Sequence, residues 1–261
     1  MSGHVRTERT GHVVTITLDR PERRNALDVP SMRELRHALQ EVAVDPLSRA
    51  VLLTGSGAAF SAGGDVAVMD EYRARGELPQ LFHALTAEME QGVRDLVSMP
   101  KPVVAALPGV AAGGGLSLAL AADWRIASDR AVLVPAFSQL GAVPDGGLTY
   151  FLPHYLGLGL AQELLFTRAK VDAARARELG LVHEVVPANE LVERSRRRAE
   201  ELAEGPTMAY AWTKRLLQSA FSSSLETQLG LERRGAVEAA RGPELEEGIR
   251  AFREKRPPKF A

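Results

Sequence analysis

The segment "VVAALPGVAAGGGLSLALAA", residues 103–122, contains no charged side chain. Twenty uncharged residues are enough to cross a membrane as a helix. The composition argues against that interpretation, because alanine and glycine dominate and the glycines at 113–115 interrupt the segment, as does Pro108-Gly109. The segment instead predicts a buried strand, a turn and a buried helix.

The sequence on both sides of this segment also alternates between short apolar runs and longer amphipathic segments. Strands rich in β-branched residues are predicted at 13–18, 50–54, 103–107, 124–127 and 181–186. Between the first two, residues 31–45 predict an amphipathic helix that Ser31 caps, with Glu34 at the capping-box position. The apolar residues at helical spacing in this helix are Met32, Leu35, Leu39 and Val42. The fold class is therefore α/β.

After about residue 158 the pattern becomes mostly helical. We therefore expect a core over residues 1–190, which binds the substrate, and a C-terminal helical segment over 191–261 for assembly and closure of the site. The charge run at 193–200 fits a solvated helix face, because no aromatic residues are interleaved with it.

The composition excludes several classes of function. The chain has 261 residues, 32 basic and 33 acidic side chains, and a net charge of −1, so nothing attracts nucleic acid or an anionic membrane. Cysteine is absent, which excludes disulfides, thiolate metal sites and a cysteine nucleophile. The N-terminus lacks an apolar signal core, and a soluble cytoplasmic protein is expected.

Two glycine-rich turns, "FSAGGD" (60–65) and "AAGGGLS" (111–117), each precede a predicted helix. A helix start presents free N–H groups, and glycine allows a ligand to approach the backbone closely. Two such turns that face each other would hold a developing oxyanion between main-chain donors. The alternative is that both turns serve only close packing.

"GLSLA" (115–119) differs by one residue from a nucleophile elbow, and Asp145 and His154 follow Ser117 in the order of an α/β-hydrolase. The elbow places its serine on a sharp turn directly after a strand. Here the predicted strand ends ten positions before Ser117, which falls inside a helix. A serine hydrolase is therefore an alternative with a geometric mismatch.

Several long motifs, in order, show that the chain resembles the enoyl-CoA hydratase/isomerase family, also called the crotonase family. They are "LDRPERRNALD" (18–28), "AFSAGGDV" (59–66), "KPVVAALPGVAAGGGLSLALAADWRIAS" (101–128), "FSQLGAVPDGGLTYFLPHYLG" (137–157), "ARELGLVHEVVP" (176–187) and "FREKRPPKF" (252–260). The resemblance is closest to isomerases of the phenylacetate-degradation type.

The resemblance implies a crotonase-like spiral of ββα units, followed by helices that build a homotrimer or a hexamer. It implies an acyl-CoA thioester substrate and no separate cofactor or metal, because coenzyme A is part of the substrate. The family's two oxyanion donors fall on the amides of Gly64 and Gly114. The implied coenzyme A contacts are Arg23, Ala26, Leu27, Ala62, Asp65 and Val66, with Phe252 and Lys255 from the C-terminal segment.

The departures from the family pattern bear on the chemistry. The two glutamates of the family's hydratases fall on Ser117 and Phe137, neither of which can move a proton, so these residues are expected to shape the substrate pocket instead. What remains is Asp145 in "VPDGG", where the similar isomerases carry an aspartate and the aryl-CoA dehalogenases carry a nucleophile. A purely structural alternative is that Asp145 caps a helix.

We therefore expect an enoyl-CoA isomerase that uses Asp145 as its acid–base, in fatty acid metabolism or aromatic degradation. The alternatives are a thioester hydrolase or dehalogenase in which Asp145 is the nucleophile, and a non-catalytic acyl-CoA binder. A further alternative is that the segment 67–99 supplies a second acid–base group, which would be His83, Glu88 or Glu90.

Overall fold

Two β-sheets organise the computed structural model, which describes residues 3–167 and 169–260. The larger sheet has the order β1-β2-β3-β5-β7-β10 and is parallel except for the β1–β2 pair. Its strands are β1 (Val5–Thr10), β2 (Val13–Leu18), β3 (Ala50–Gly55), β5 (Val103–Leu107), β7 (Trp124–Ser128) and β10 (Glu184–Val186). The smaller sheet contains β4 (Ala59–Ser61), β6 (Val110–Ala112), β8 (Val132–Val134) and β9 (Val171–Asp172).

A repeating unit generates both sheets. Strands β3, β5 and β7 enter the larger sheet, and each is followed by a short strand of the smaller sheet and then by helix. The helices are α2 (Val66–Ala74) and α3 (Leu78–Ser98) after β4, and α4 (Gly114–Ala121) after β6. After β8 come the 3₁₀ helix η2 (Ala136–Leu140) and α5 (Leu148–Leu156). This is the predicted spiral of ββα units.

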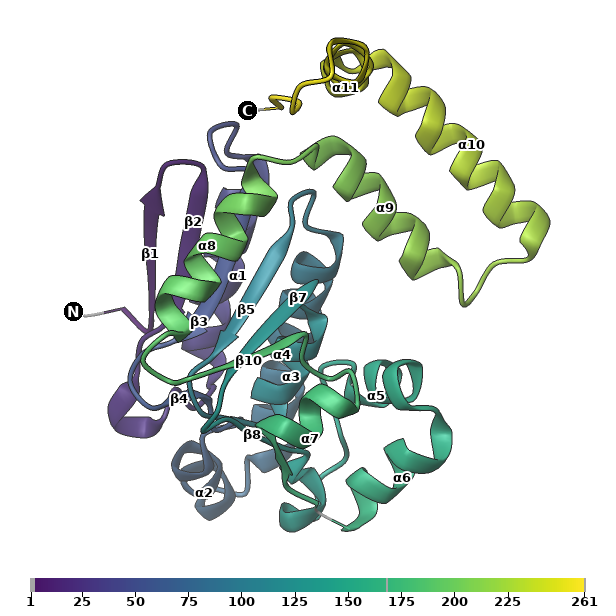
Figure 1. Ribbon diagram of the computed structural model, residues 1–261. Coiled ribbons are helices and arrows are strands. Elements are labelled where there is room, and N and C mark those ends of the chain that lie inside the picture. The colour runs from purple at the N-terminus through teal and green to yellow at the C-terminus, as the bar shows by residue number, and fades with distance from the viewer. Residues whose placement is uncertain (1–2, 168, 261) are drawn as a thin grey trace.

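The side chains of the larger sheet alternate between two hydrophobic clusters, as the pleat requires. One face, which includes Val14, Val51 and Val103, packs with α1 (Val29–Val44), α3 and α4 in the main core. The opposite face packs against α8 (Leu191–Ala203), which crosses the sheet in Figure 1. The glycine turns lie on the side of the main core.

The predicted helix after β2 is present, but its cap is not Ser31. Helix α1 begins at Val29, and the Asp28 side chain accepts a hydrogen bond from the Ser31 amide. Ser31 is the third helical residue, and its hydroxyl returns a hydrogen bond with the Asp28 amide. The capping box therefore lies three residues earlier than predicted, with Asp28 as the cap and Ser31 as its partner, and Pro30 in the first helical turn is favourable there.

The segment 103–122 has the predicted order of strand, turn and helix, as β5 and α4. Its turn also contains β6, which is only three residues long and joins the second sheet. No helix in the described residues is both long and apolar enough to cross a membrane.

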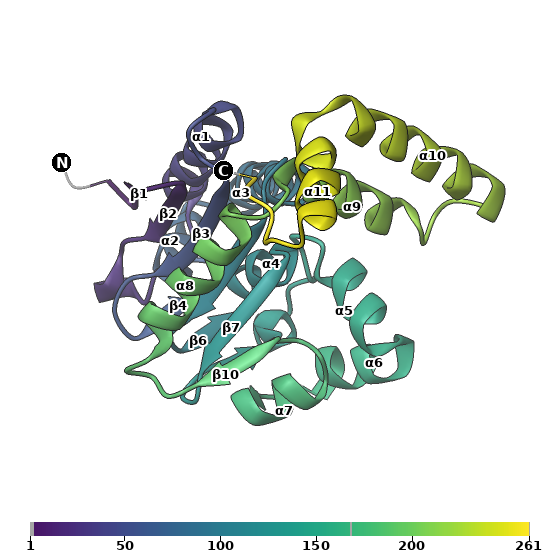
Figure 2. The same cartoon turned by 45° about the horizontal axis from the view of Figure 1, so that its top comes forward.

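After residue 158 the chain is mostly helical, as predicted, except for the unpredicted β9 and for β10, which covers only 184–186 of the predicted strand 181–186. The remaining elements are η1 (Pro21–Arg23), α6 (Leu158–Thr167), α7 (Ala173–Glu178), α9 (Thr207–Ser219), α10 (Leu225–Arg241) and α11 (Pro243–Glu254). Helix α8 packs on the sheet, whereas α9, α10 and α11 extend away from it in both views (Figures 1 and 2).

Candidate active site

The two glycine turns lie against each other. A Cβ atom added to Gly63 would lie 2.7 Å from the carbonyl oxygen of Ala112, and one added to Gly113 would lie 3.9 Å from the Gly63 Cα. Both residues have positive φ angles, of +84° and +49°. Only glycine tolerates this backbone shape and this contact together.

The amide of Gly64 is left free by the way its turn is attached. Leu27 donates from its amide to the Gly63 carbonyl at 2.7 Å, and its own carbonyl accepts from the Asp65 amide at 2.9 Å. This short parallel bridge passes over Gly64, and α2 begins two residues later at Val66. Gly114 is the first residue of α4, where an amide has no partner within the helix. Within residues 3–167 and 169–260, neither amide donates a hydrogen bond.

Asp145 lies beside the second turn. Its Oδ1 is 3.9 Å from the position of a Cβ atom added to Gly114. The residue belongs to a turn that precedes α5, and its carbonyl accepts from the Leu148 amide at 3.1 Å. The cap of α5 is Gly147, without a side-chain hydrogen bond, so the Asp145 carboxylate does not cap this helix.

Burial is the one cause that shifts the acidity of Asp145. Removal from water raises the pKa of its carboxyl group from 3.8 to about 6, and no charge or hydrogen bond among the described residues compensates for it. A carboxyl group with such a pKa exchanges protons near neutral pH, as an acid–base group requires.

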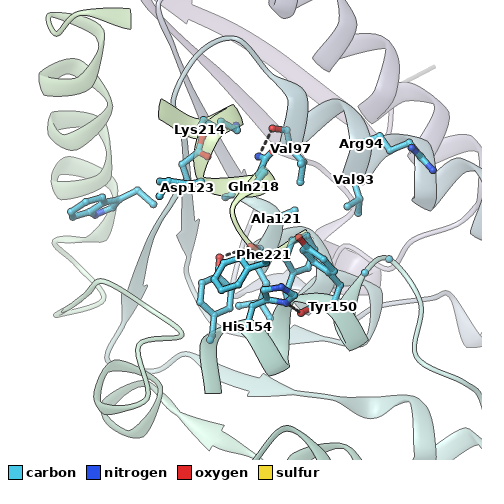
Figure 3. A pocket seen from close by; sticks show the side chains of 18 of the residues that line it. Val93, Arg94, Val97, Ala121, Asp123, Tyr150, His154, Lys214, Gln218 and Phe221 are labelled. Atoms are coloured by element: carbon cyan, nitrogen blue, oxygen red, sulfur yellow. Dashed lines mark hydrogen bonds and ion pairs between the residues drawn. The ribbon is translucent and has the colours of Figure 1, made fainter. Parts of the chain in front are cut away.

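Asp145 lines a large cavity of about 1030 Å³. Its walls come from α3, the end of α4, α5 and α9, and most of the lining is apolar. Tyr150 and His154 of α5 and Phe221 after α9 gather on one side (Figure 3), with ring centroids 4.1 Å apart for Tyr150–His154 and 4.5 Å apart for His154–Phe221. At the other side Lys214 of α9 contacts Asp123 at 2.8 Å.

The two positions of the missing hydratase glutamates differ in their surroundings. Ser117 is fully buried in α4, and its Oγ donates to the Asp145 carbonyl at 2.9 Å. The Phe137 ring is partly buried and lies 3.9 Å from the position of a Cβ atom added to Gly113. Neither residue is among those that line the cavity, so the expectation that they shape it directly stays a prediction.

The arrangement of the serine hydrolase alternative is not assembled. Ser117 lies in the interior of α4 rather than on a turn after a strand. The ring of His154 contacts the Tyr150 carbonyl at 2.5 Å, lies tilted against the Tyr150 ring and meets the Phe221 ring edge-on. Among the described residues, no hydrogen bond joins His154 to Ser117 or to Asp145.

The candidates for a second acid–base group fall in different places on α3. Hydrogen bonds from Arg33 and Arg36 lower the pKa of the Glu88 carboxyl group and engage it away from the cavity. Glu90 lines the cavity but pairs with Arg94 at 2.8 Å. His83 is exposed on the same helix.

Most of the coenzyme A candidates lie on the rim of the glycine turn at 60–65. Arg23 is half-exposed and bonds to Asp65 at 2.9 Å. Burial would raise the pKa of the Asp65 carboxyl group, but hydrogen bonds from Arg23 and the Val68 amide lower it, and Asp65 caps α2. Ala26 and Leu27 are buried. Ala62 is partly buried and Val66 is exposed.

Phe252 and Lys255 do not join this group within one chain. Phe252 is 85% exposed on α11, and Lys255 ends that helix. Figure 1 places α11 at the opposite end of the molecule from α2. A contact between these two residues and a coenzyme A bound at α2 would therefore need a neighbouring chain.

The family that the sequence motifs suggest is supported by comparison with known proteins. The sequence matches the enoyl-CoA hydratase/isomerase family over residues 8–261. The chain belongs to this family.

Relatives in the family carry different activities in their names. A probable enoyl-CoA hydratase of Rhodobacter capsulatus is 40% identical over 261 residues, which cover 100% of this chain and 99% of the relative. The 1,2-epoxyphenylacetyl-CoA isomerase of Escherichia coli is 38% identical over 248 residues, which cover 95% and 94%. The solved structure of an enoyl-CoA hydratase from Polaromonas sp. JS666 matches with a TM-score of 0.94 at 35% identity. The match covers 99% of the present chain and 100% of the Polaromonas chain. The crotonase-like fold is confirmed.

Met89 is a site neighbour that sequence reasoning missed. Its Cε lies 2.7 Å from the position of a Cβ atom added to Gly114, and its Cγ lies 3.1 Å from that of Gly146. Helical spacing with Leu85 and Val93 marks Met89 only as a core residue of α3. Its place beside Asp145 depends on how α3 packs across α4.

Proposed function

We propose that this protein is an enoyl-CoA isomerase, in which Asp145 moves a proton along the acyl chain while the amides of Gly64 and Gly114 hold the thioester oxygen. The observation that carries the proposal is the carboxylate of Asp145, which lies beside Gly114, lines a mostly apolar cavity and has no ion-pair partner among the described residues.

One carboxylate is sufficient for migration of a double bond. The Asp145 carboxylate removes a proton from the carbon between the thioester and the double bond, and the electron pair moves onto the thioester oxygen. The protonated Asp145 then returns the proton at the far end of the shifted system, and the thioester carbonyl forms again. No water is consumed and nothing leaves the substrate.

The two amides act on the charge that develops on the thioester oxygen. Each donor of this kind contributes about 3 kcal/mol to catalysis, and a positioned acid–base group contributes roughly 10²–10⁴ in rate. The family's hydration scheme needs two carboxylates, and its positions hold Ser117 and Phe137 here. The side chains thus favour isomerisation over hydration.

A panel of 3-enoyl-, 2-enoyl- and aryl-CoA thioesters, with products identified by mass, tests the proposal. Isomerisation of 3-enoyl-CoA leaves the mass unchanged and moves the double bond into conjugation with the thioester, which is followed by absorbance. Efficient hydration of 2-enoyl-CoA, which adds a water, would contradict the proposal.

A second candidate is ring-opening isomerisation of an epoxide-bearing aryl-CoA. It is favoured by the aromatic wall of Tyr150, His154 and Phe221 and by the 38% identity to the Escherichia coli epoxide isomerase. In the same panel, loss of the epoxide at unchanged mass identifies this reaction. Release of free coenzyme A or of halide would instead indicate Asp145 as a nucleophile.

A further inference from the structure

The hydroxyl group of Ser117 connects the two turns that carry the proposed site. Ser117 is the fourth residue of α4 and is fully buried. Its Oγ lies 2.9 Å from the carbonyl oxygen of Asp145 and 3.4 Å from that of Gly113. Because a hydroxyl group donates one proton, the shorter contact makes the Asp145 carbonyl the main acceptor.

The Asp145 carbonyl is held from two sides. Ser117 donates to it from α4, and the Leu148 amide donates to it from the first residue of α5 at 3.1 Å. The main chain at Asp145 is therefore fixed to the helix whose first amide belongs to Gly114. The side chain of Asp145 leaves from this fixed point.

The turn is also pressed against α4 at the next residue. A Cβ atom added to Gly146 would lie 2.8 Å from the Ser117 Cβ and 3.1 Å from the Met89 Cγ. Gly146 has a φ angle of +58°, which glycine adopts without strain. The hydrogen bond at Asp145 and the packing at Gly146 thus both hold this turn against α4.

We propose that Ser117 is a positioning residue that aligns the Asp145 carboxylate with the Gly114 amide. This inference rests on the proposed function of Asp145 and adds a role for a position at which the resemblance to hydratases implies a glutamate. Ser117 transfers no proton to the substrate, and it acts through the main chain of Asp145.

The first test is Ser117→Ala, which removes the hydroxyl group and keeps the helix. We expect kcat for 3-enoyl-CoA to fall by roughly 10- to 100-fold, as for a small displacement of a catalytic group, with KM nearly unchanged. The matched control is Ser195→Ala in α8, where a buried serine donates to the Leu191 carbonyl at 2.7 Å, far from the cavity. Equal kcat values for wild type and Ser117→Ala would overturn the inference.

A double-mutant cycle separates positioning from an independent effect. If Ser117 acts through Asp145, Ser117→Ala adds little to the loss caused by Asp145→Asn. Losses that multiply would contradict a role through Asp145. If the alanine variant does not fold, Ser117→Cys, which keeps the shape but donates weakly, carries the same comparisons.

A measurement without substrate keeps the inference separate from the proposed function. The Asp145 carboxyl group is titrated by NMR with carbon-labelled aspartate, and its signal is assigned by its loss in Asp145→Asn. We expect the midpoint to move from about 6 toward 3.8 in Ser117→Ala, because a loosened turn admits water to the carboxyl group. An unchanged midpoint would contradict positioning. Full turnover in Asp145→Asn would refute the proposed function. The titration would then still test whether Ser117 positions the Asp145 carboxyl group.

Discussion

At the scale of a single residue, Asp145 combines a cost in stability with a gain in reactivity. In residues 3–167 and 169–260 no cation and no hydrogen-bond donor offsets the burial of its carboxyl group, and burial raises its pKa from 3.8 to about 6. The folded protein therefore binds more protons than the unfolded chain between these two values, and the free energy of unfolding falls as pH rises through this window.

Replacement of Asp145 by asparagine should therefore stabilise the protein at neutral pH. Asp145→Asn removes the buried charge, and we expect a gain of about 2 kcal/mol at pH 7–8 after allowance for solvent screening. Below about pH 3, where the Asp145 carboxyl group is protonated in both states, the two proteins should unfold at similar temperatures. Thermal unfolding of both proteins from about pH 3 to about pH 8 measures the difference. An equal stability at pH 8 would show that water solvates the carboxylate.

The same substitution should remove the activity. Asparagine has nearly the shape of aspartate but cannot accept the substrate proton, so turnover of 3-enoyl-CoA should fall roughly 10²-fold or more while thioester binding persists. In the wild type, kcat/KM should rise with pH up to about 6 and then level off, because the base must be ionised. A variant that is more stable and still active would reduce Asp145 to a structural role.

At the scale of elements, the site is made by close contact of turns with helices. Gly146→Ala places a methyl group 2.8 Å from the Ser117 Cβ at a φ angle of +58°. We expect a loss of more than about 1 kcal/mol in stability and a clear fall in turnover. The matched control is Gly141→Ala, with a φ angle of +68° and open space around the new methyl group. Chemical denaturation and turnover of both variants should separate strain alone from strain with steric conflict. Equal effects would mean that the turn at Gly146 can move away from α4.

The sequence predicts those elements whose pattern is local. The strands at β2, β3, β5 and β7 follow from runs of β-branched residues, and α1 follows from the spacing of Met32, Leu35 and Leu39. The strands β4, β6 and β8 are three residues long, and such short segments carry no period of their own. They were not predicted individually, and the family resemblance supplied the spiral instead.

For the site, the local signals were the glycine turns and the isolated charge of Asp145. The absence of a capping hydrogen bond, the contact with Ser117 and the place of Met89 depend on how α3, α4 and α5 pack. These contacts join residues between 25 and 57 positions apart, and no local pattern encodes them.

At the scale of the whole molecule, the C-terminal helices expose more apolar surface than a single chain needs. In α10 only Gly235 is buried, and in α11 only Glu247 and Ala251 are buried, while most of the large apolar residues of both helices are exposed. The exposed apolar residues of these two helices are Leu225, Leu229, Val237, Leu245, Ile249 and Phe252. So many exposed large apolar side chains on two helices favour an interaction site.

We therefore predict that the protein assembles into a homotrimer or hexamer through α10 and α11. Leu229→Glu combined with Ile249→Glu places two charges on this surface, where residues 229 and 249 are 54% and 55% exposed, and should yield smaller species in light scattering together with a lower melting temperature. The matched control is Val192→Glu on α8, which is 77% exposed but lies on the helix that covers the sheet. If the contacts of Phe252 and Lys255 with coenzyme A come from a neighbouring chain, the dissociated variant should also bind the thioester more weakly. A wild-type protein that stays a stable monomer at micromolar concentration would contradict this prediction.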